Sequence, residues 1–458
     1  MAGATTIGNL SNTTNLDGLL KNVYLPTLID TTYNDASLTA FIKRDASLLP
    51  GGGNNITNFF LTQRAEGVGA ISEGGNYLTS VPVKGKQGTD DVKYLNAYIE
   101  LTGPVIKAAN SGQKSAIMAV TKSFETNIIA YKNNFDRMLA GSGDGVLATV
   151  SGVGSIPTSL GISSRGYSAA QYTPVGTRLK IITYNGSNVI TKVVDIETND
   201  REIGVVDSIV SEDLDAGTAE ILIVDATNAA ALDNAGTSDA AVSDVLVRES
   251  AYGTITTSST AVSDIQEING LQQLVSDGVN NSETTTNFTT IWNINRTTTN
   301  SYQLKSLTKN VNAELDEEVL LGIVQDMKYN RQARPNMLLV SPRSELKYFL
   351  NSKDDRRFNT MTALNFEGGF TKNAIAMGGD IRLILSSLAS IPDSLIYIIN
   401  TNDFAFAANS PPTWVLGDGG QVLVQSHTGD NKFASMVEYV NFVLLNPRHQ
   451  FKGYNVTT

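Results

Sequence analysis

Strict alternation of apolar and polar residues marks one strand of this chain more clearly than any other. It runs over residues 93–101, and its apolar positions are Leu95, Ala97, Ile99 and Leu101. A period of two is typical of a strand that is buried on one face only. Residues 56–62 predict a second strand, and we interpret the two as the arms of a long hairpin. The stretch between them is studded with glycines and has little to bury, so we expect it to be disordered or to lie on another molecule.

Apolar residues at steps of three and four predict a long helix over residues 111–140. Its stripe consists of Ile117, Val120, Phe124, Ile128, Tyr131, Phe135 and Met138. The turn GSGDG at 141–145 ends the helix, because glycine tolerates a left-handed C-terminal turn. We expect Phe124, Ile128 and Phe135 to form the core side of this helix and to pack under a sheet.

Short strands rich in Ile, Val and Thr dominate residues 172–250. They are predicted at 178–184, 189–195, 203–206 and 220–224. Asn185-Gly186, between the first two, is the strongest short-range signal for a β-hairpin. This region therefore predicts a small all-β domain.

Helical and strand patterns mix after residue 264. A helix is predicted at 311–329, ending before Arg334-Pro335 as a proline requires. A buried strand at 337–340 precedes a helix opened by Ser341-Pro342, where proline suits the first helical position. The later strands are predicted at 381–385, 395–399, 421–424 and 434–445. The fold class indicated is α+β.

Charge and composition exclude several classes of protein. The 458 residues include 34 Lys and Arg against 45 Asp and Glu, a formal charge of −11. Direct reading of nucleic acid usually needs a basic surface. No cysteine is present, which removes disulfides, thiolate nucleophiles and Cys-based metal sites. Neither a signal peptide nor an apolar stretch of about 18 residues occurs, so we expect a soluble protein made in a cytoplasm.

Catalytic chemistry finds no anchor in the sequence. The two histidines, His427 and His449, have no Asp or Glu at metal-ligand spacing. Phosphate-binding and nucleophile-elbow motifs are missing. The acidic stretch 195–200 lacks the glycine and late glutamate of a calcium loop, and 354–357 is a self-neutralising charge cluster. We expect no enzyme, no cofactor and no metal.

The order of these elements resembles the major capsid protein family of tailed double-stranded-DNA bacteriophages. FDRMLAGSGDGVLA at 135–148 is similar to the end of that family's spine helix, and PNMLLVSP at 335–342 to its axial-domain core. Arg356-Arg357-Phe358 follows the second motif in the same way. Pro412-Thr413-Trp414 with Gly419-Gly420, and VLLNPR at 443–448, resemble the closing strands of the family.

The resemblance implies a division of the chain into named parts. These are an N-terminal arm (1–53), an extended hairpin loop (54–104), a peripheral domain (105–171) with the spine helix, an inserted β domain (172–250), a return to the peripheral domain (251–309), an axial domain (310–430) and a final peripheral strand with the C-terminus (431–458). Some family members begin with a charged helical scaffolding segment. This chain shows none, which implies a separate scaffolding protein.

The function implied is self-assembly, as hexamers and pentamers, into the icosahedral shell around the phage genome. The implied partners are the chain itself, a scaffolding protein, a portal, a cement protein and packaged double-stranded DNA that is contacted non-specifically, with no membrane. Its place would be the virion, with assembly in the host cytoplasm. Candidate assembly residues are Gly67, Gly69, Gly74, Gly75, Lys84 and Lys86. An encapsulin-type cellular compartment shares the fold and stays open as an alternative, whereas two long helices speak against a β-rich surface adhesin.

Overall fold

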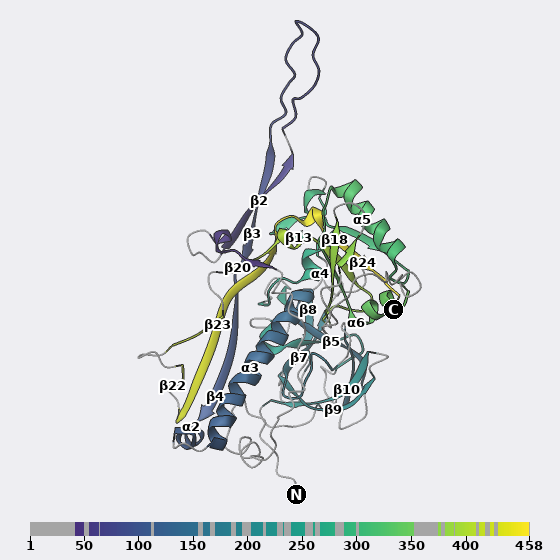
Figure 1. Cartoon of the computed structure of the whole chain (residues 1–458). Helices are drawn as coiled ribbons and strands as arrows, with labels where there is room; N and C mark the ends of the chain where they lie inside the picture. The colour runs from purple at the N-terminus through teal and green to yellow at the C-terminus, as the bar shows by residue number, and fades with distance from the viewer. Residues whose placement is uncertain are drawn as a thin grey trace, which may run out of the picture. The chain divides into compact units, whose positions relative to one another are not determined.

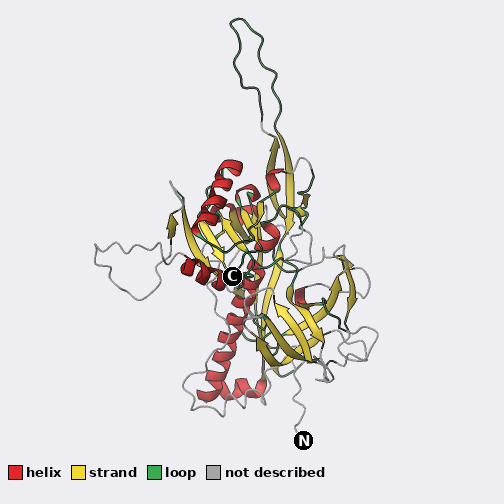
Figure 2. Cartoon of the chain, turned by 90° about the vertical axis from the view of Figure 1, so that its right-hand side faces the viewer, coloured by secondary structure: helices red, strands yellow, loops and turns green. Residues whose placement is uncertain are grey.

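The computed structural model describes most of the chain after residue 41. The described residues are 42–49, 55–63, 65–110, 114–153, 159–164, 170–184, 189–194, 203–213, 217–226, 232, 240–251, 260–261, 266–279, 288–298, 302–351, 374–376, 381–388, 390–408, 412–416, 422–425 and 429–457. Nearly all of the expected N-terminal arm lies outside them. Both helices and sheets are present, as the α+β prediction requires (Figure 2).

The chain divides into two compact units. Of the described residues, the first unit contains those within 93–268 and 410–440, and the second contains those within 39–92, 269–409 and 441–458. Strand β23 (Asn431–Leu444) passes from the first unit into the second. None of the described helices is long and apolar enough to span a membrane.

A two-stranded antiparallel ladder forms the backbone of the first unit. Strand β4 (Lys93–Thr102) pairs with β23 from Thr102↔Asn431 to Lys93↔Val440. The short strands β21 (Thr413–Trp414) and β22 (Val424–Gln425) pair with the same stretch of β23. The apolar positions predicted for β4 are buried, which confirms the period-two pattern.

The predicted pairing of the hairpin was wrong. Strand β2 (Asn55–Gln63) pairs with β3 (Lys84–Asp91), not with β4. Strand β3 has the sequence KGKQGTDD, which contains no apolar residue, so no alternation could reveal it. The true partner of β4 lies more than 300 residues further along the chain, beyond the reach of a local pattern.

Helices α2 (Gly103–Asn110) and α3 (Lys114–Ala140) follow β4 in the first unit. The ring of Phe124 meets that of Trp414 with centroids 5.3 Å apart, and Phe124 packs with Val120 against the buried residues of β4. Phe135 is 5% exposed, so two of the three predicted core residues contact the interior.

Ile128 is the exception on this helix, because 45% of it is exposed. The side-chain amide of Asn127 donates a hydrogen bond to the carbonyl of Tyr98 at 3.2 Å, so Asn127 points at the sheet. By helix geometry Ile128 lies on the same side of α3 as Phe124 and Phe135, but its exposure shows that the core does not reach it. The prediction that Ile128 belongs to the core was therefore wrong.

Substitutions on α3 should separate these two positions. We expect Phe135→Ala to lower the free energy of unfolding by about 3–5 kcal/mol, the usual loss for a buried phenylalanine. Ile128→Ala should change it by less than about 1 kcal/mol, as expected for an exposed side chain. Urea titration followed by circular dichroism measures both free energies of unfolding. Equal losses would contradict the burial of Phe135 and the exposure of Ile128.

Eight further strands of the first unit form one antiparallel sheet. They are β5 (Val146–Val153), β6 (Ser159–Ser164), β7 (Arg178–Tyr184), β8 (Val189–Val193), β9 (Gly204–Asp213), β10 (Thr218–Asp225), β11 (Val245–Arg248) and β12 (Thr260–Ala261). Their order is β11-β5-β6-β10-β9-β7-β8-β12, and β11 also pairs with β7, which closes six strands into a ring.

This closed ring is wider than the region 172–250 that was expected to hold it. Strands β5 and β6 belong to it, so the sheet begins at Val146. Its interior is apolar, with Leu160, Ile181 and Ile221 fully buried. Strands β7 and β8 pair as predicted, although the turn at 185–186 lies outside the described residues.

A mixed six-stranded sheet forms the core of the second unit. Its order is β15 (Leu307–Asn310), β24 (Phe451–Tyr454), β19 (Ile396–Ile399), β16 (Met337–Val340), β18 (Arg382–Ser387) and β17 (Ala374–Ala376). Helices α5 (Glu317–Arg331) and α6 (Pro342–Asn351) belong to this unit, and α5 contributes Leu320, Ile323, Val324 and Met327 to its core (Figure 1). Strand β24 lies in this sheet. The segment 431–458, which was expected to be one peripheral part, is therefore divided between the two units.

Helix α5 begins later than the sequence predicted. The carboxylate of Asp316 accepts a hydrogen bond from the backbone N–H of Val319 at 2.7 Å, which caps the first turn. Residues 307–310 form strand β15, which ends before the helix begins. Apolar spacing continues upstream of Asp316, and the cap decides where the helix starts.

The remaining elements of the second unit are short. They are β1 (Lys43–Arg44), α4 (Leu271–Leu274), β13 (Thr290–Ile291), β14 (Ile294–Asn295) and β20 (Phe404–Ala408). Strand β20 pairs with β1, and the ring of Phe404 stacks on that of Phe442 at the end of β23, with centroids 5.3 Å apart.

Candidate assembly surface

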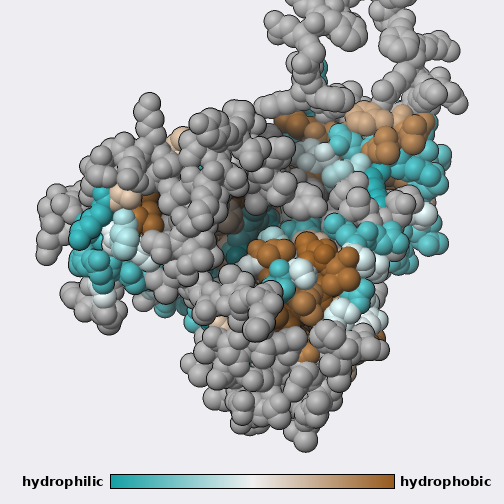
Figure 3. Space-filling model, turned by 90° about the horizontal axis from the view of Figure 1, so that it is seen from below, coloured by the Kyte–Doolittle hydropathy of each residue, from teal (hydrophilic) through white to brown (hydrophobic). Residues whose placement is uncertain are grey.

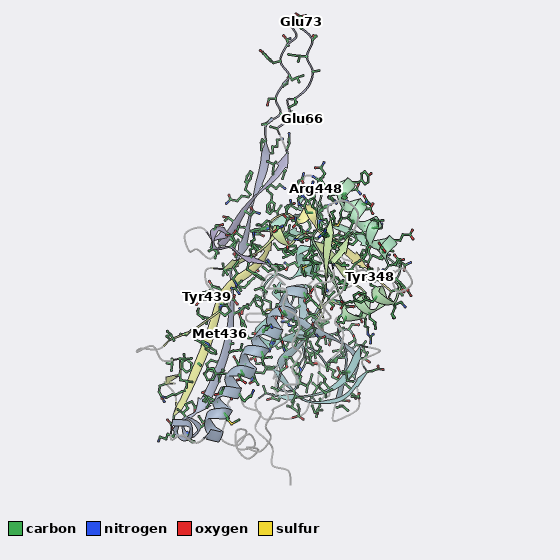
Figure 4. All side chains as sticks on the ribbon, viewed as in Figure 1. Glu66, Glu73, Tyr348, Met436, Tyr439 and Arg448 are labelled. Carbon is green, nitrogen blue, oxygen red and sulfur yellow. The ribbon has the colours of Figure 1, made fainter. Side chains whose placement is uncertain are left out.

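The hairpin of the second unit extends beyond its paired strands. Strands β2 and β3 are in register from Asn55↔Asp91 to Gln63↔Lys84. Further out, one bridge joins the two limbs, in which Glu66 and Val81 exchange backbone hydrogen bonds of 3.3 and 2.7 Å. Every residue from 65 to 87 is exposed. Figure 1 shows this loop reaching out past β2 and β3, and Figure 4 marks Glu66 and Glu73 along it.

Large apolar side chains lie along the exposed part of this hairpin. They are Phe59, Leu61, Val68, Ile71, Tyr77, Leu78, Val81 and Val83. Val68 and Tyr77 are 95% and 93% exposed, so the chain itself gives them almost no cover. Single exposed apolar residues are ordinary, but a group of them on one element marks an interaction surface.

The predicted glycines of the tip have distinct structural roles. Gly74 has φ +75° at the outer turn, where a side chain would be strained, and the N–H of Gly75 closes that turn on the carbonyl of Ser72 at 2.9 Å. A side chain at Gly67 or Gly69 would meet the opposite limb, since the nearest atoms lie 3.3 and 2.8 Å from an added Cβ. These glycines let the two limbs run close together.

Lys84 and Lys86, the other two predicted assembly residues, lie on β3 and are both exposed. Gly85 stands between them, and the ring of Phe59 occupies the space that a side chain at this position would need. Gly85 and Gly88 lie in the paired strand β3, so part of the glycine-rich stretch between the two expected arms is itself a strand.

Trp292 holds the root of the hairpin, and it was not among the residues predicted from the sequence. Its ring meets that of Phe60 edge to face, with centroids 5.7 Å apart. Its carbonyl accepts a hydrogen bond from the N–H of Thr89 at 3.1 Å, and its indole N–H donates to the carbonyl of Leu444 at 2.8 Å. Trp292 lies in the Thr- and Asn-rich stretch TTIWNINRTTT, where no periodic pattern indicates these contacts.

Two asparagines add polar anchors at the same root. The amide of Asn269 donates to a carboxylate oxygen of Asp90 at 2.6 Å, and the amide of Asn441 donates to the carbonyl of Asp91 at 2.7 Å. With Ile56 fully buried and Phe60 7% exposed, the root is fixed while the tip is uncovered.

A second exposed aromatic surface lies on β4 and β23 of the first unit. Tyr94 and Tyr439 pack edge to face at 5.2 Å, and Tyr98 stacks on Phe433 at 5.7 Å. The three tyrosines are between 45% and 58% exposed. Figure 4 marks Tyr439 on β23, and Figure 3, a view from below, shows hydrophobic groups exposed beside hydrophilic ones. The hairpin is thus not the sole apolar surface of the chain.

The described residues contain one histidine–carboxylate contact and no group of metal ligands. Nδ1 of His449 lies 3.1 Å from a carboxylate oxygen of Asp403, and Asn446 and Gln450 complete a local network. Within the described part of the chain, no three His, Cys, Asp or Glu side chains gather as metal ligands. His427 and the acidic stretches 195–200 and 354–357 lie outside that part.

Comparisons with known proteins give structural matches alone. No protein-family model matches the chain, and no curated protein does. Among the solved structures that match over nearly the whole chain are capsid structures. The capsid of cyanophage A-1(L) is 9% identical, with 94% of this chain and 96% of that chain covered and a TM-score of 0.45. The capsid of a native GTA particle is 7% identical (98% and 100% covered, TM-score 0.44), and that of Myoviridae phage XM1 is 9% identical (94% and 95%, 0.40).

Proposed function

We propose that this chain is a shell-forming structural protein, the major capsid protein of a tailed bacteriophage, which encloses the genome as hexamers and pentamers. The observation that carries the proposal is the hairpin, anchored at its root and exposed without interruption from residue 65 to residue 87. At 7–9% identity and TM-scores below 0.5, the capsid matches do not assign a function by themselves.

The energetics of the hairpin favour a partner. Ordering a backbone costs roughly 1–2 kcal/mol per residue, and glycine loses the most freedom. The tip recovers little of this within its own chain, since its most exposed apolar side chains, Val68 and Tyr77, are 95% and 93% exposed. Contacts with another molecule would supply the compensation, as burial of apolar surface contributes about 25 cal/mol per Å².

Another copy of the same chain is the partner that fits these features best. The chain presents apolar residues both on the hairpin and on the aromatic face of β4 and β23, so copies can cover one another without a further protein. Repeated contacts between different faces of identical copies build closed rings when the rotation closes, as the proposed hexamers and pentamers require. A net charge of −11 also keeps a container from binding packaged DNA tightly.

The remaining partners follow from this proposal. A separate scaffolding protein would guide assembly in the host cytoplasm, a portal would occupy one vertex, and a cement protein would bind the finished shell of the virion.

Electron microscopy of the purified chain, produced with its scaffolding protein, tests the proposal. We expect closed icosahedral particles that sediment far faster than the subunit. A monodisperse monomer under all assembly conditions would overturn the shell function. Closed shells that package a protein cargo, with no DNA and no portal, would favour an encapsulin-type compartment instead.

A further inference from the structure

Arg296 is buried completely and binds four backbone carbonyls. One guanidinium nitrogen donates to the carbonyls of Leu274 and Ser276 at 3.3 and 2.8 Å. The other donates to those of Gln273 and Thr290 at 2.9 and 3.2 Å. Burial lowers the pKa of Arg296 to about 9, and the neighbouring Asp277 opposes this shift. A cation in such a position is unfavourable unless its hydrogen bonds are needed there.

The four carbonyls belong to two different segments of the chain. Three lie at or just past the end of α4, where a helix leaves its last carbonyls unpaired. The fourth, of Thr290, lies on β13. The N–H of Arg296 also donates to the carbonyl of Thr289 at 2.7 Å. Arg296 therefore connects the end of α4 with the β13–β14 hairpin. We call this set of contacts the Arg296 junction.

The turn of the β13–β14 hairpin holds Trp292 in an unusual conformation. Ile291 pairs with Ile294, so the turn consists of Trp292 and Asn293, with φ of 53° and 57°. A two-residue turn of this kind favours glycine and asparagine, and tryptophan is poorly suited to the left-handed region. Such a residue persists where its surroundings fix it, and these positions are concentrated at functional parts of proteins.

Trp292 in turn contacts the root of the assembly hairpin through Phe60 and Thr89. Gly88 leaves the space for this contact, because a side chain there would come within 2.6 Å of the Trp292 Cβ. We propose that Arg296 and Trp292 are positioning residues: the Arg296 junction fixes the turn, and Trp292 fixes the direction of the hairpin that β2 and β3 form. The consequence for shell geometry rests on the proposed function, whereas the positioning itself does not.

Arg296→Lys tests the first step. Lysine offers a point charge with three donors and lacks the planar fork that reaches several acceptors at once. The chain has two tryptophans, so Trp414→Phe leaves Trp292 as the single fluorescent reporter. In this background we expect Arg296→Lys to increase acrylamide quenching of Trp292 and to accelerate hydrogen exchange of the Thr89 amide by about tenfold or more, with the amides of β5 to β11 unchanged. Arg382→Lys, at an exposed arginine of β18, is the matched control.

A second variant covers the case in which Arg296→Lys fails to fold. Trp292→Leu keeps an apolar side chain but removes the ring contact and the indole donor. It should accelerate exchange at Thr89 while the amide of Arg296 stays protected. Unchanged exchange at Thr89 in a folded variant would overturn the proposal. Global unfolding of both variants would do so too, since the two residues would then support the whole unit and not the hairpin.

Assembly is measured separately, so that the two proposals can fail independently. If the parent chain forms shells, the folded Arg296→Lys variant should give irregular particles or none, and regular shells would refute a role of hairpin direction in assembly. If the parent forms no shells, the proposed function fails. The exchange and quenching results on the single chain then still decide the positioning role.

Discussion

Replacing residues 66–81 by Asn-Gly is expected to abolish shell formation and to leave the melting temperature of the single chain nearly unchanged. The removed residues are all exposed and contribute nothing to the core of the second unit, so the loss of stability should stay within about 0.5 kcal/mol. Asn-Gly is the preferred sequence for a two-residue turn and lets the shortened limbs close. The hairpin, in contrast, loses five of its eight exposed large apolar residues at once.

Calorimetry of the subunit and electron microscopy of assembly reactions check the two halves of this expectation. Point variants refine it: Val68→Ser and Tyr77→Ser remove the two most exposed apolar groups of the tip. Val242→Ser is the matched control, because Val242 is 62% exposed and lies outside the hairpin. Shells as robust as those of the parent from the deletion variant would show that the hairpin does not lock the lattice.

Local sequence patterns correctly predicted those parts of the fold that depend on neighbouring residues. The strand at 337–340 and the strand at 178–184 have the limits that the sequence predicted. The glycine turn after α3 is confirmed as well: Gly143 and Gly145 have φ of 69° and 73°. A side chain at Gly145 would also meet the Cβ of Ala251 at 2.3 Å, so both backbone and space require glycine there.

Partners distant in sequence explain what the patterns missed. The alternation in β4 predicted a half-buried strand correctly but could not say that its partner is β23. The closed ring of β strands starts at Val146 because β5 and β6 complete it, although neither shows a stronger signal than its neighbours. For the assembly surface, the sequence could indicate a hairpin tip unable to bury itself. The role of Trp292 depends on contacts with residues about 200 positions away.

A buried ion pair in the first unit should be the most sensitive point of its core. The guanidinium of Arg137, at the end of α3, donates to the carboxylate of Glu267, and both side chains are 7% exposed. Arg248 lies close by. Burial lowers the pKa of Arg248 to about 10, the charge of Arg137 adds to the decrease, and Glu267 opposes it. One carboxylate thus compensates two arginines.

Glu267→Ala is accordingly expected to lower the free energy of unfolding by about 3–5 kcal/mol, because it leaves the buried Arg137 without its anion. Glu125→Ala is the matched control on the same unit: Glu125 pairs with Lys122 at 2.5 Å, but both side chains are nearly half exposed. Water screens such a pair, so its loss should change stability by less than about 1 kcal/mol. Urea titration of the single chain compares the two variants. A similar small change in both would mean that solvent reaches Arg137 and Arg248, and that Glu267 is not what balances their charge.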